Sequence, residues 1–336
     1  MKHLKYSDVA LVPQYSDVYS RLDCDTSIDL FGKKYNLPII PANMKSVIDM
    51  KLSKWMSDND YFYIMHRFGN NLREIVTQMN NENWDTISVS MGIKMGDKKD
   101  IVALSKQKQR VDFVTIDIAH GHCERMRIAI ECVKKYLPDT KIIAGNVATP
   151  RAVADLSAWG ADIVKVGIGQ GSPCTTKDKT GFTMPMFSCI KKCSKVSFSR
   201  EDGFMISNAS LSEDFDIPER VPIIADGGIK HNGDVAKALA AGAKIAMAGG
   251  IFASCSDSPA TSNTINDVPH KSYFGSASYE NKGHKNNIEG KLTNIISNEM
   301  TYDEKLKEIK QDIQSSISYS GGNNLNSLYN IEYIEV

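Results

Sequence analysis

Short apolar runs recur along the chain, and a stretch with helical periodicity follows each of them. The runs are rich in Ile and Val and end in a polar residue or a glycine. Apolar side chains at consecutive positions are typical of strands that are buried on both faces of a parallel sheet. The runs are Pro38–Asn43, Tyr61–His66, Thr86–Met91, Phe113–Ile118, Lys141–Asn146, Ile163–Ile168, Pro222–Gly227 and Ile245–Gly250. Eight such units predict an α/β fold, a (β/α)8 TIM barrel, in preference to an open doubly wound sheet.

Helix boundaries are marked by capping residues. Thr149 followed by Pro150 indicates an N-cap with proline at the first helical position. Residues 232–241 form a compact amphipathic pattern, and Gly242 is expected to end that helix. The pattern therefore alternates strand and helix along most of the chain.

The spacing of the runs predicts a single barrel domain over residues 1–336. One exception is the interval between the sixth and seventh runs, whose starts lie about 60 residues apart. It contains a polar excursion at residues 197–219 with little periodicity, which lies either on the surface or over the mouth of the barrel.

Polar residues stand at the end of almost every predicted strand. Active sites of such barrels lie at the C-terminal ends of the strands. Each residue taken alone could be a helix cap or a turn residue, but the set indicates a functional site. It comprises Asn43, His66, Asp117, His120, Asn146, Asp226 and the glycines at 227–228 and 249–250.

Composition narrows the class of protein. The 336 residues are 42% hydrophobic, which is enough for a large core, and 40 basic residues balance 40 acidic ones. We therefore expect neither nucleic acid nor a membrane as partner. Seven cysteines without a CxxC pair favour a reducing, cytoplasmic location over a disulfide framework.

The most specific segment is Val166–Thr176, which reads VGIGQGSPCTT. Glycines at alternate positions allow the backbone to turn its N–H or C=O groups toward one centre, which suits a phosphate or a monovalent cation. Cys174 follows at once, and a thiol in such a loop can act as a nucleophile. A buried cysteine in a turn would give the same pattern.

Two glycine-rich strand ends predict a phosphate site. They read IIADGG at Ile223–Gly228 and IAMAGG at Ile245–Gly250, at the seventh and eighth strands. Phosphate sites of barrels commonly form at these two strand ends. Asp226 can accept hydrogen bonds from vicinal ribose hydroxyls.

A third segment, Ile116–His122, reads IDIAHGH. An acid followed closely by two histidines could bind a metal, transfer protons or contact a cofactor ribose. We disfavour the metal, because Cys123 is expected to begin the next helix and to point elsewhere.

These motifs resemble, in order along the whole chain, the reductase branch of the IMP dehydrogenase/GMP reductase family. Dehydrogenases of the family usually carry an inserted pair of CBS modules after the second strand, for which this chain has no room. The sequence after Cys174 also resembles that of the reductases. The matching segments are PANM (41–44), MHRF (65–68), IDIAHGH, AGNVAT (144–149), KVGIGQGSPCTT, KTGF (179–182), IIADGGI, AGGIFA (248–253), YFGSAS (273–278), EGK (289–291) and SSISYSGG (315–322).

The resemblance implies a reaction in which NADPH reduces GMP to IMP with release of ammonia. It implies that Cys174 adds to purine C2 and that Glu289, acting through the Thr176 hydroxyl, protonates the departing amine. A mobile flap is expected over residues 270–295.

The resemblance also implies binding roles, a potassium site and a homotetramer. For the purine nucleotide these are Met44, Ser172, Asp226, Gly227, Gly228, Gly249, Gly250, Ser276, Ala277 and Gly290. For the cofactor they are Lys94 and Asp117, with Ser318 and Tyr319 reaching a neighbouring subunit's cofactor. For potassium they are the carbonyl groups of Gly167, Gly169 and Cys174.

The sequence departs from the family pattern at two places. Pro173 precedes the nucleophile where relatives carry a small aliphatic residue, and it removes an N–H group from the loop. The excursion at 197–219 is longer than the family leads us to expect. A specialised paralogue that accepts a related nucleotide, for example a deoxynucleotide, is therefore an alternative. An IMP dehydrogenase and a nucleotide-binding regulator without turnover are the others.

Overall fold

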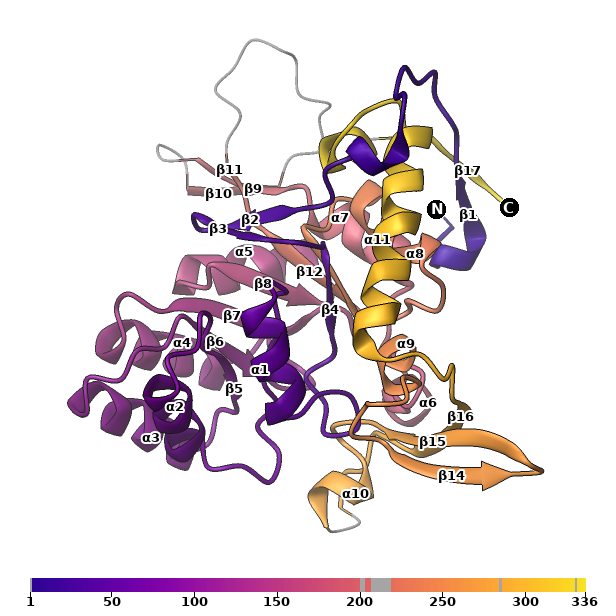
Figure 1. Ribbon diagram of the computed structural model, residues 1–336. Helices are drawn as coiled ribbons and strands as arrows, with labels where there is room; N and C mark the ends of the chain where they lie inside the picture. The colour runs from indigo at the N-terminus through magenta and orange to yellow at the C-terminus, as the bar shows by residue number, and fades with distance from the viewer. Residues whose placement is uncertain (1, 200–202, 207–218, 284–285, 330) are drawn as a thin grey trace.

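A curled parallel sheet of seven strands forms the centre of the molecule (Figure 1). The computed structural model describes the whole chain except residues 1, 200–202, 207–218, 284–285 and 330. The strand order is β4-β13-β12-β8-β7-β6-β5. The strands are β4 (Ile39–Pro41), β5 (Ser88–Met91), β6 (Phe113–Asp117), β7 (Lys141–Val147), β8 (Ile163–Val166), β12 (Ile223–Asp226) and β13 (Ile245–Ala248). This confirms the predicted α/β barrel class, and seven of the eight predicted runs supply its strands.

The second predicted run, Tyr61–His66, does not form a strand. Its apolar side chains are buried as expected, but Met65 makes one isolated parallel bridge, to Val89 of β5. The Met65 amide donates to the Ser88 carbonyl at 3.0 Å. In a regular parallel ladder the next acceptor would be the Thr86 carbonyl, but this carbonyl accepts from the hydroxyls of Tyr63 and Ser57 instead. Side-chain hydrogen bonds therefore replace the backbone ladder at this position.

Helices follow the strands and cover the outside of the sheet (Figure 1). Thr149 caps α5 as predicted, since its hydroxyl accepts from the Ala152 amide at 3.2 Å, and Gly242 after α8 adopts a φ of +105°. The helices are α1 (Met50–Asp58), α2 (Leu72–Asn81), α3 (Met95–Lys106), α4 (Glu124–Tyr136), α5 (Pro150–Trp159), α6 (Thr176–Thr180), α7 (Met186–Cys193), α8 (Gly233–Ala240), α9 (Gly250–Ala253), α10 (Tyr279–Lys282) and α11 (Tyr302–Tyr319).

Two small sheets lie at opposite ends of the barrel (Figure 1). One is the antiparallel sheet of β14 (Thr261–Ile265), β15 (Val268–Phe274) and β16 (Leu292–Ile296), which lies with α6 at the end where the active-site loops are expected. The other is built by the excursion.

The described parts of the excursion lie at the other end of the barrel. They are β9 (Val196–Ser199), β10 (Gly203–Ile206) and β11 (Glu219–Arg220), which pair antiparallel and pack with α5. This sheet follows the end of α7 and precedes the start of β12, so it belongs to a helix-to-strand connection. Residues 200–202 and 207–218 of the predicted excursion lie outside the described residues.

The chain ends are tied to the barrel by short strands. β1 (Val9–Leu11) pairs antiparallel with β17 (Tyr333–Glu335), and β2 (Ile28–Leu30) pairs with β3 (Lys33–Tyr35). One-turn helices occupy residues 6–8, 21–23 and 325–328.

We expect Thr149→Ala to lower the free energy of unfolding by about 1 kcal/mol, because the amide of Ala152 then loses its capping acceptor. Thr149→Ser keeps the hydroxyl and is expected to retain most of the stability. Denaturant unfolding of the two variants checks this, and equal losses in both would rule out the cap as the cause.

Candidate active site

The loop after β8 carries Cys174 and is shaped by its glycines. The Gly167 amide donates to the Val147 carbonyl at 2.8 Å, which fixes the start of the loop to β7. Gly167 has a φ of +144°, and a Cβ there would lie 2.0 Å from the Asp226 carbonyl oxygen. Gly169 also has a positive φ, of +74°. The loop therefore needs glycine at both positions in order to pass close to β12.

Cys174, Thr176 and Glu289 form one hydrogen-bonded chain. The Cys174 thiol donates to Thr176 Oγ1 at 3.2 Å, and the Thr176 hydroxyl donates to Glu289 Oε2 at 2.7 Å. All three side chains are partly buried. A proton can thus pass between the thiol and a carboxylate that lies 113 residues further along the chain.

Backbone pairing brings Glu289 to the cysteine. The Thr175 amide donates to the Glu289 carbonyl at 2.8 Å, and the Lys291 amide donates to the Pro173 carbonyl at 2.9 Å. These bonds flank an antiparallel bridge between Cys174 and Gly290. The segment before β16 is therefore a short strand partner of the cysteine loop.

The residues predicted to contact the base surround this pairing. Ala277 accepts from the Glu289 amide at 3.1 Å, and a Cβ on Gly290 would lie 2.9 Å from the Ser278 amide nitrogen. Ser276 lies in the same turn, and Ser172 is exposed on the cysteine loop. Met44 follows β4, and its sulfur lies 3.9 Å from the Tyr273 hydroxyl.

The predicted phosphate corner is assembled from three glycine-rich turns. Gly227 and Gly228 have φ values of +110° and +81°, and a Cβ on Gly227 would lie 3.2 Å from the Gly171 amide nitrogen. Gly249 precedes Gly250, where α9 begins, and a Cβ on Gly249 would lie 2.0 Å from the Tyr273 hydroxyl. These turns thus lie close to the cysteine loop and to a buried tyrosine hydroxyl.

Asp117 and Asp226 are joined by a lysine that the sequence interpretation missed. Lys165 Nζ lies 3.0 Å from Asp117 Oδ1 and 2.8 Å from Asp226 Oδ2. Burial by itself raises the pKa of Asp117, but the charges of Lys165 and Arg67 and a hydrogen bond from Asn43 outweigh it and hold that pKa below its usual range. The signal for Lys165 was a lone charge within an apolar strand, which must find counter-charges when buried.

Arg67 and Asn146 were also not assigned a role, although both lie in matched motifs. Arg67 Nε and Asn146 Oδ1 are buried and have no hydrogen-bond partner within the described part of the chain. Asn146 Nδ2 donates to Asp226 Oδ2 at 2.8 Å. Such unsatisfied groups beside two carboxylates fit a polar ligand.

Several predicted residues are not brought to this centre. His122 pairs with Asp155 at 2.9 Å, so Asp117, His120 and His122 do not converge. Lys94 is exposed at the start of α3. Ser318 and Tyr319 end α11, near the N-terminal segment, where Arg21 lies 5.0 Å from the Tyr319 ring centroid. The described residues contain no group of three or more His, Cys, Asp or Glu that could hold a metal ion.

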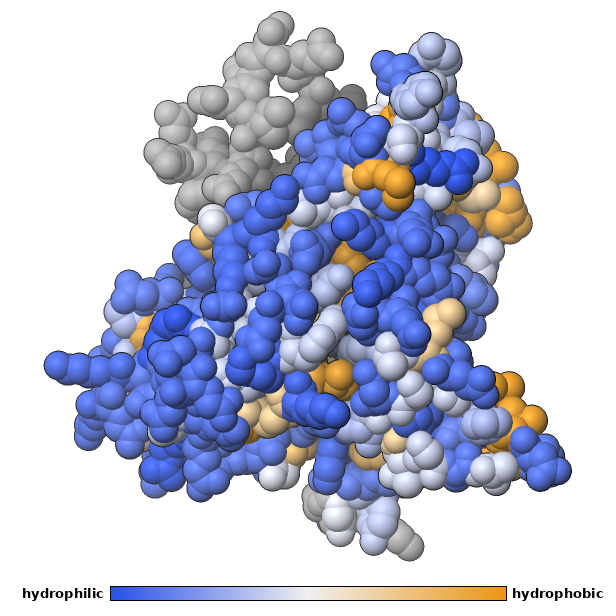
Figure 2. Space-filling model, in the orientation of Figure 1, coloured by the Kyte–Doolittle hydropathy of each residue, from blue (hydrophilic) through white to orange (hydrophobic). Residues whose placement is uncertain are grey.

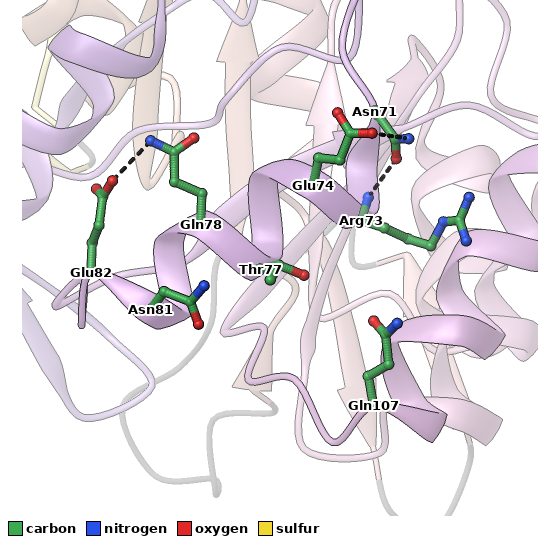
Figure 3. A pocket seen from close by; sticks show the side chains of 8 residues that line it. All are labelled: Asn71, Arg73, Glu74, Thr77, Gln78, Asn81, Glu82 and Gln107. Atoms are coloured by element: carbon green, nitrogen blue, oxygen red, sulfur yellow. Dashed lines mark hydrogen bonds between the residues drawn. The ribbon is translucent and has the colours of Figure 1, made fainter.

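A separate groove on the surface lies away from this chemistry. It measures about 590 Å³ and is lined by residues of α2 and by Gln107 after α3 (Figure 3). Gln78 donates to Glu82, and Asn71 donates to Glu74, so the polar groups there largely bind one another. It contains none of the predicted site residues.

A parallel α/β barrel that presents a thiol, a hydroxyl and a carboxylate in sequence beside glycine-rich turns defines a class of nucleotide-transforming barrel enzymes. Within that class, the chain belongs to the IMP dehydrogenase/GMP reductase family, whose domain model matches residues 3–335. It is 40% identical over 339 residues to the GMP reductase of Staphylococcus aureus strain MRSA252, with 100% of this chain and 97% of the relative covered. The GMP reductases of strains JH9 and Newman match to the same extent.

We expect Gly167→Ala to lower the free energy of unfolding by about 2 kcal/mol or more, because the methyl group collides with the Asp226 carbonyl at a positive φ. Gly171→Ala is the matched control in the same loop, since a Cβ there has no neighbour closer than 3.7 Å. Thermal unfolding of both variants measures the difference. Equal stability of the two would contradict the close approach of loop and strand.

Proposed function

We propose that this chain is a GMP reductase, an oxidoreductase that converts GMP and NADPH into IMP, ammonia and NADP⁺. The observation that carries the proposal is the hydrogen-bonded chain from Cys174 through Thr176 to Glu289. The family match over residues 3–335 and the full-length relatives named GMP reductase support it.

The first step uses the hydrogen-bonded chain to activate the thiol. The Cys174 proton passes to the Thr176 hydroxyl while that hydroxyl gives its own proton to Glu289. The thiolate then forms a bond to electron-poor C2 of the purine, and the electron pair moves onto the ring nitrogen.

The second step returns the same proton. Protonated Glu289 donates through Thr176 to the amino group on C2, the C2–N bond breaks, and ammonia leaves. The purine remains bound to the Cys174 sulfur. NADPH supplies a hydride to C2 when it is bound. The thiolate of Cys174 then leaves C2 with the bonding electrons, IMP is released, and solvent returns one proton to the sulfur.

Binding roles follow from the turns around the cysteine. Asp226 would accept from the ribose hydroxyls, while the glycine turns at 227–228 and 249–250 with Ser172 would hold the phosphate through N–H groups. Met44, Ser276, Ala277 and Gly290 would surround the base. Asp117, with the unsatisfied Arg67 Nε, fits the polar groups of the cofactor, and Lys94 would lie further along it.

A potassium ion is compatible with the cysteine loop. Carbonyl oxygens are the donors that suit this cation, and Gly167, Gly169 and Cys174 offer three of them. The Gly167 carbonyl already accepts from Asn146 Nδ2 at 2.8 Å, so it would bind the ion through its second lone pair.

We further propose a cytoplasmic homotetramer in which Ser318 and Tyr319 reach a neighbour's cofactor. Exposed aromatic and aliphatic side chains near these residues, Tyr15, Tyr19 and Leu22, supply apolar surface for a second copy. Further apolar surface lies toward the β14–β15 tip, where Ile265 and Val268 are exposed on an otherwise hydrophilic face (Figure 2). Among the described helices, none is long and apolar enough to cross a membrane.

We expect the purified chain to oxidise NADPH in the presence of GMP and to release one ammonia per turnover. Cys174→Ala should reduce this rate to about one-thousandth or less, because the sulfur forms the bond to C2. NADPH and NADH, each with GMP, dGMP, AMP and XMP, define the substrates by absorbance and ammonia assays. Full activity of the Ala variant would contradict the covalent route, while NADH formation from IMP and NAD would indicate a dehydrogenase.

A second prediction concerns the proton relay. Glu289→Gln and Thr176→Val should each lower kcat about 100-fold or more, with the KM for GMP changed little, since both interrupt one proton path. The double variant should be no slower than about the worse single one, because the two residues act as a unit. Multiplicative losses would show that the two act independently. Thermal unfolding of each variant serves as the folding control.

A further inference from the structure

Lys165 is a buried cation that no step of the proposed reaction uses. It lies in the middle of β8, and its side chain is 3% exposed. Removing an ammonium group from water is costly unless opposite charges and hydrogen bonds compensate for it. Asp117, Asp226 and Asn43 provide that compensation, with Nζ 3.4 Å from Asn43 Oδ1.

The two carboxylates come from strands on different sides of the lysine. Asp117 ends β6, and Asp226 ends β12, the neighbour of β8 in the sheet. One is the acid proposed for the cofactor, and the other is the acid proposed for the substrate ribose. A single ammonium group thus lies between the two halves of the site.

Further hydrogen bonds fix the orientation of each carboxylate. Asn43 Nδ2 donates to Asp117 Oδ2 at 3.0 Å, so both oxygens of Asp117 are held. Lys165 and Asn146 both donate to Oδ2 of Asp226 at 2.8 Å. Among the hydrogen bonds of the described residues, none that Asp226 accepts ends on Oδ1, which leaves that oxygen for ribose hydroxyls.

We propose that Lys165 is a positioning residue that holds Asp117 and Asp226 in place together, so that substrate and cofactor are aligned through one shared ammonium group. The identities of the two ligands rest on the proposed GMP reductase function. The charge arrangement itself rests on the distances above.

Other charged and titratable groups near this trio do not replace the lysine. Arg67 acts on Asp117 through its charge, without an ion pair to Asp117 among those of the described residues. Tyr6 and Tyr273 lie near Asp226 as neutral phenols, since burial and then neighbouring acids raise their pKa values. Loss of Lys165 therefore leaves two carboxylates without their common partner.

The first test is Lys165→Met, which keeps the length of the side chain and removes its charge. We expect the KM for GMP and the KM for NADPH to rise together by about tenfold or more, with a smaller change in kcat, because both acids lose their alignment. Val133→Ala is the control for lost stability, since Val133 is buried in α4 on the outside of the barrel. Its KM values should equal those of the unaltered chain.

The second test is charge rescue, followed by thermal unfolding without ligands. Lys165→Met should lower the melting temperature, and adding Asp117→Asn should recover part of the loss because it removes one of two unpaired like charges. Asp117→Asn alone should destabilise the chain. If Lys165→Met does not fold, the double variant takes its place in the KM measurements.

These readouts separate the two proposals. A melting temperature that falls additively in the double variant, or unchanged KM values in Lys165→Met, would overturn the role of Lys165. An unaltered chain that never oxidises NADPH with GMP would overturn the proposed function instead. In that case, the rescue experiment and the rise in melting temperature on adding GMP still decide the role of Lys165.

Discussion

The buried ammonium group of Lys165 is the constraint on which the geometry of the site depends. It can remain inside the barrel only while Asp117 and Asp226 stay within hydrogen-bonding distance. That requirement fixes the ends of β6, β8 and β12 relative to one another. The cysteine loop leaves β8 two residues after this lysine and passes against β12, so its position follows from the same arrangement.

A second constraint is the pairing of two segments that are far apart in sequence. The cysteine loop and the residues before β16 form an antiparallel bridge, and this pairing brings Glu289 to Thr176. Lys179 on α6 adds a hydrogen bond to the Ile288 carbonyl. The carboxylate therefore reaches the thiol only when the 270–295 segment lies on the loop, so the proton path depends on backbone contacts outside the barrel.

The sequence predicted the repeating units well because buried parallel strands have a strong signature. It predicted a strand at 61–66 for the same reason, and it failed there because burial does not specify a ladder: hydroxyls of Tyr63 and Ser57 occupy the Thr86 carbonyl. The pairing of Thr176 with Glu289 has no local signal and came from the family resemblance. Lys165 was missed because an apolar strand pattern tolerates one charge without revealing what neutralises it.

The location of the excursion follows from barrel topology rather than from its composition. Loops after strands and loops after helices lie at opposite ends of a parallel barrel. β9 and β11 sit between α7 and β12, which places these described ends at the helix-to-strand end. The cysteine loop and the flap are both strand-to-helix connections at the other end. Substrate discrimination, including ribose against deoxyribose, should therefore depend first on residues such as Asp226 and Ser276 rather than on β9–β11.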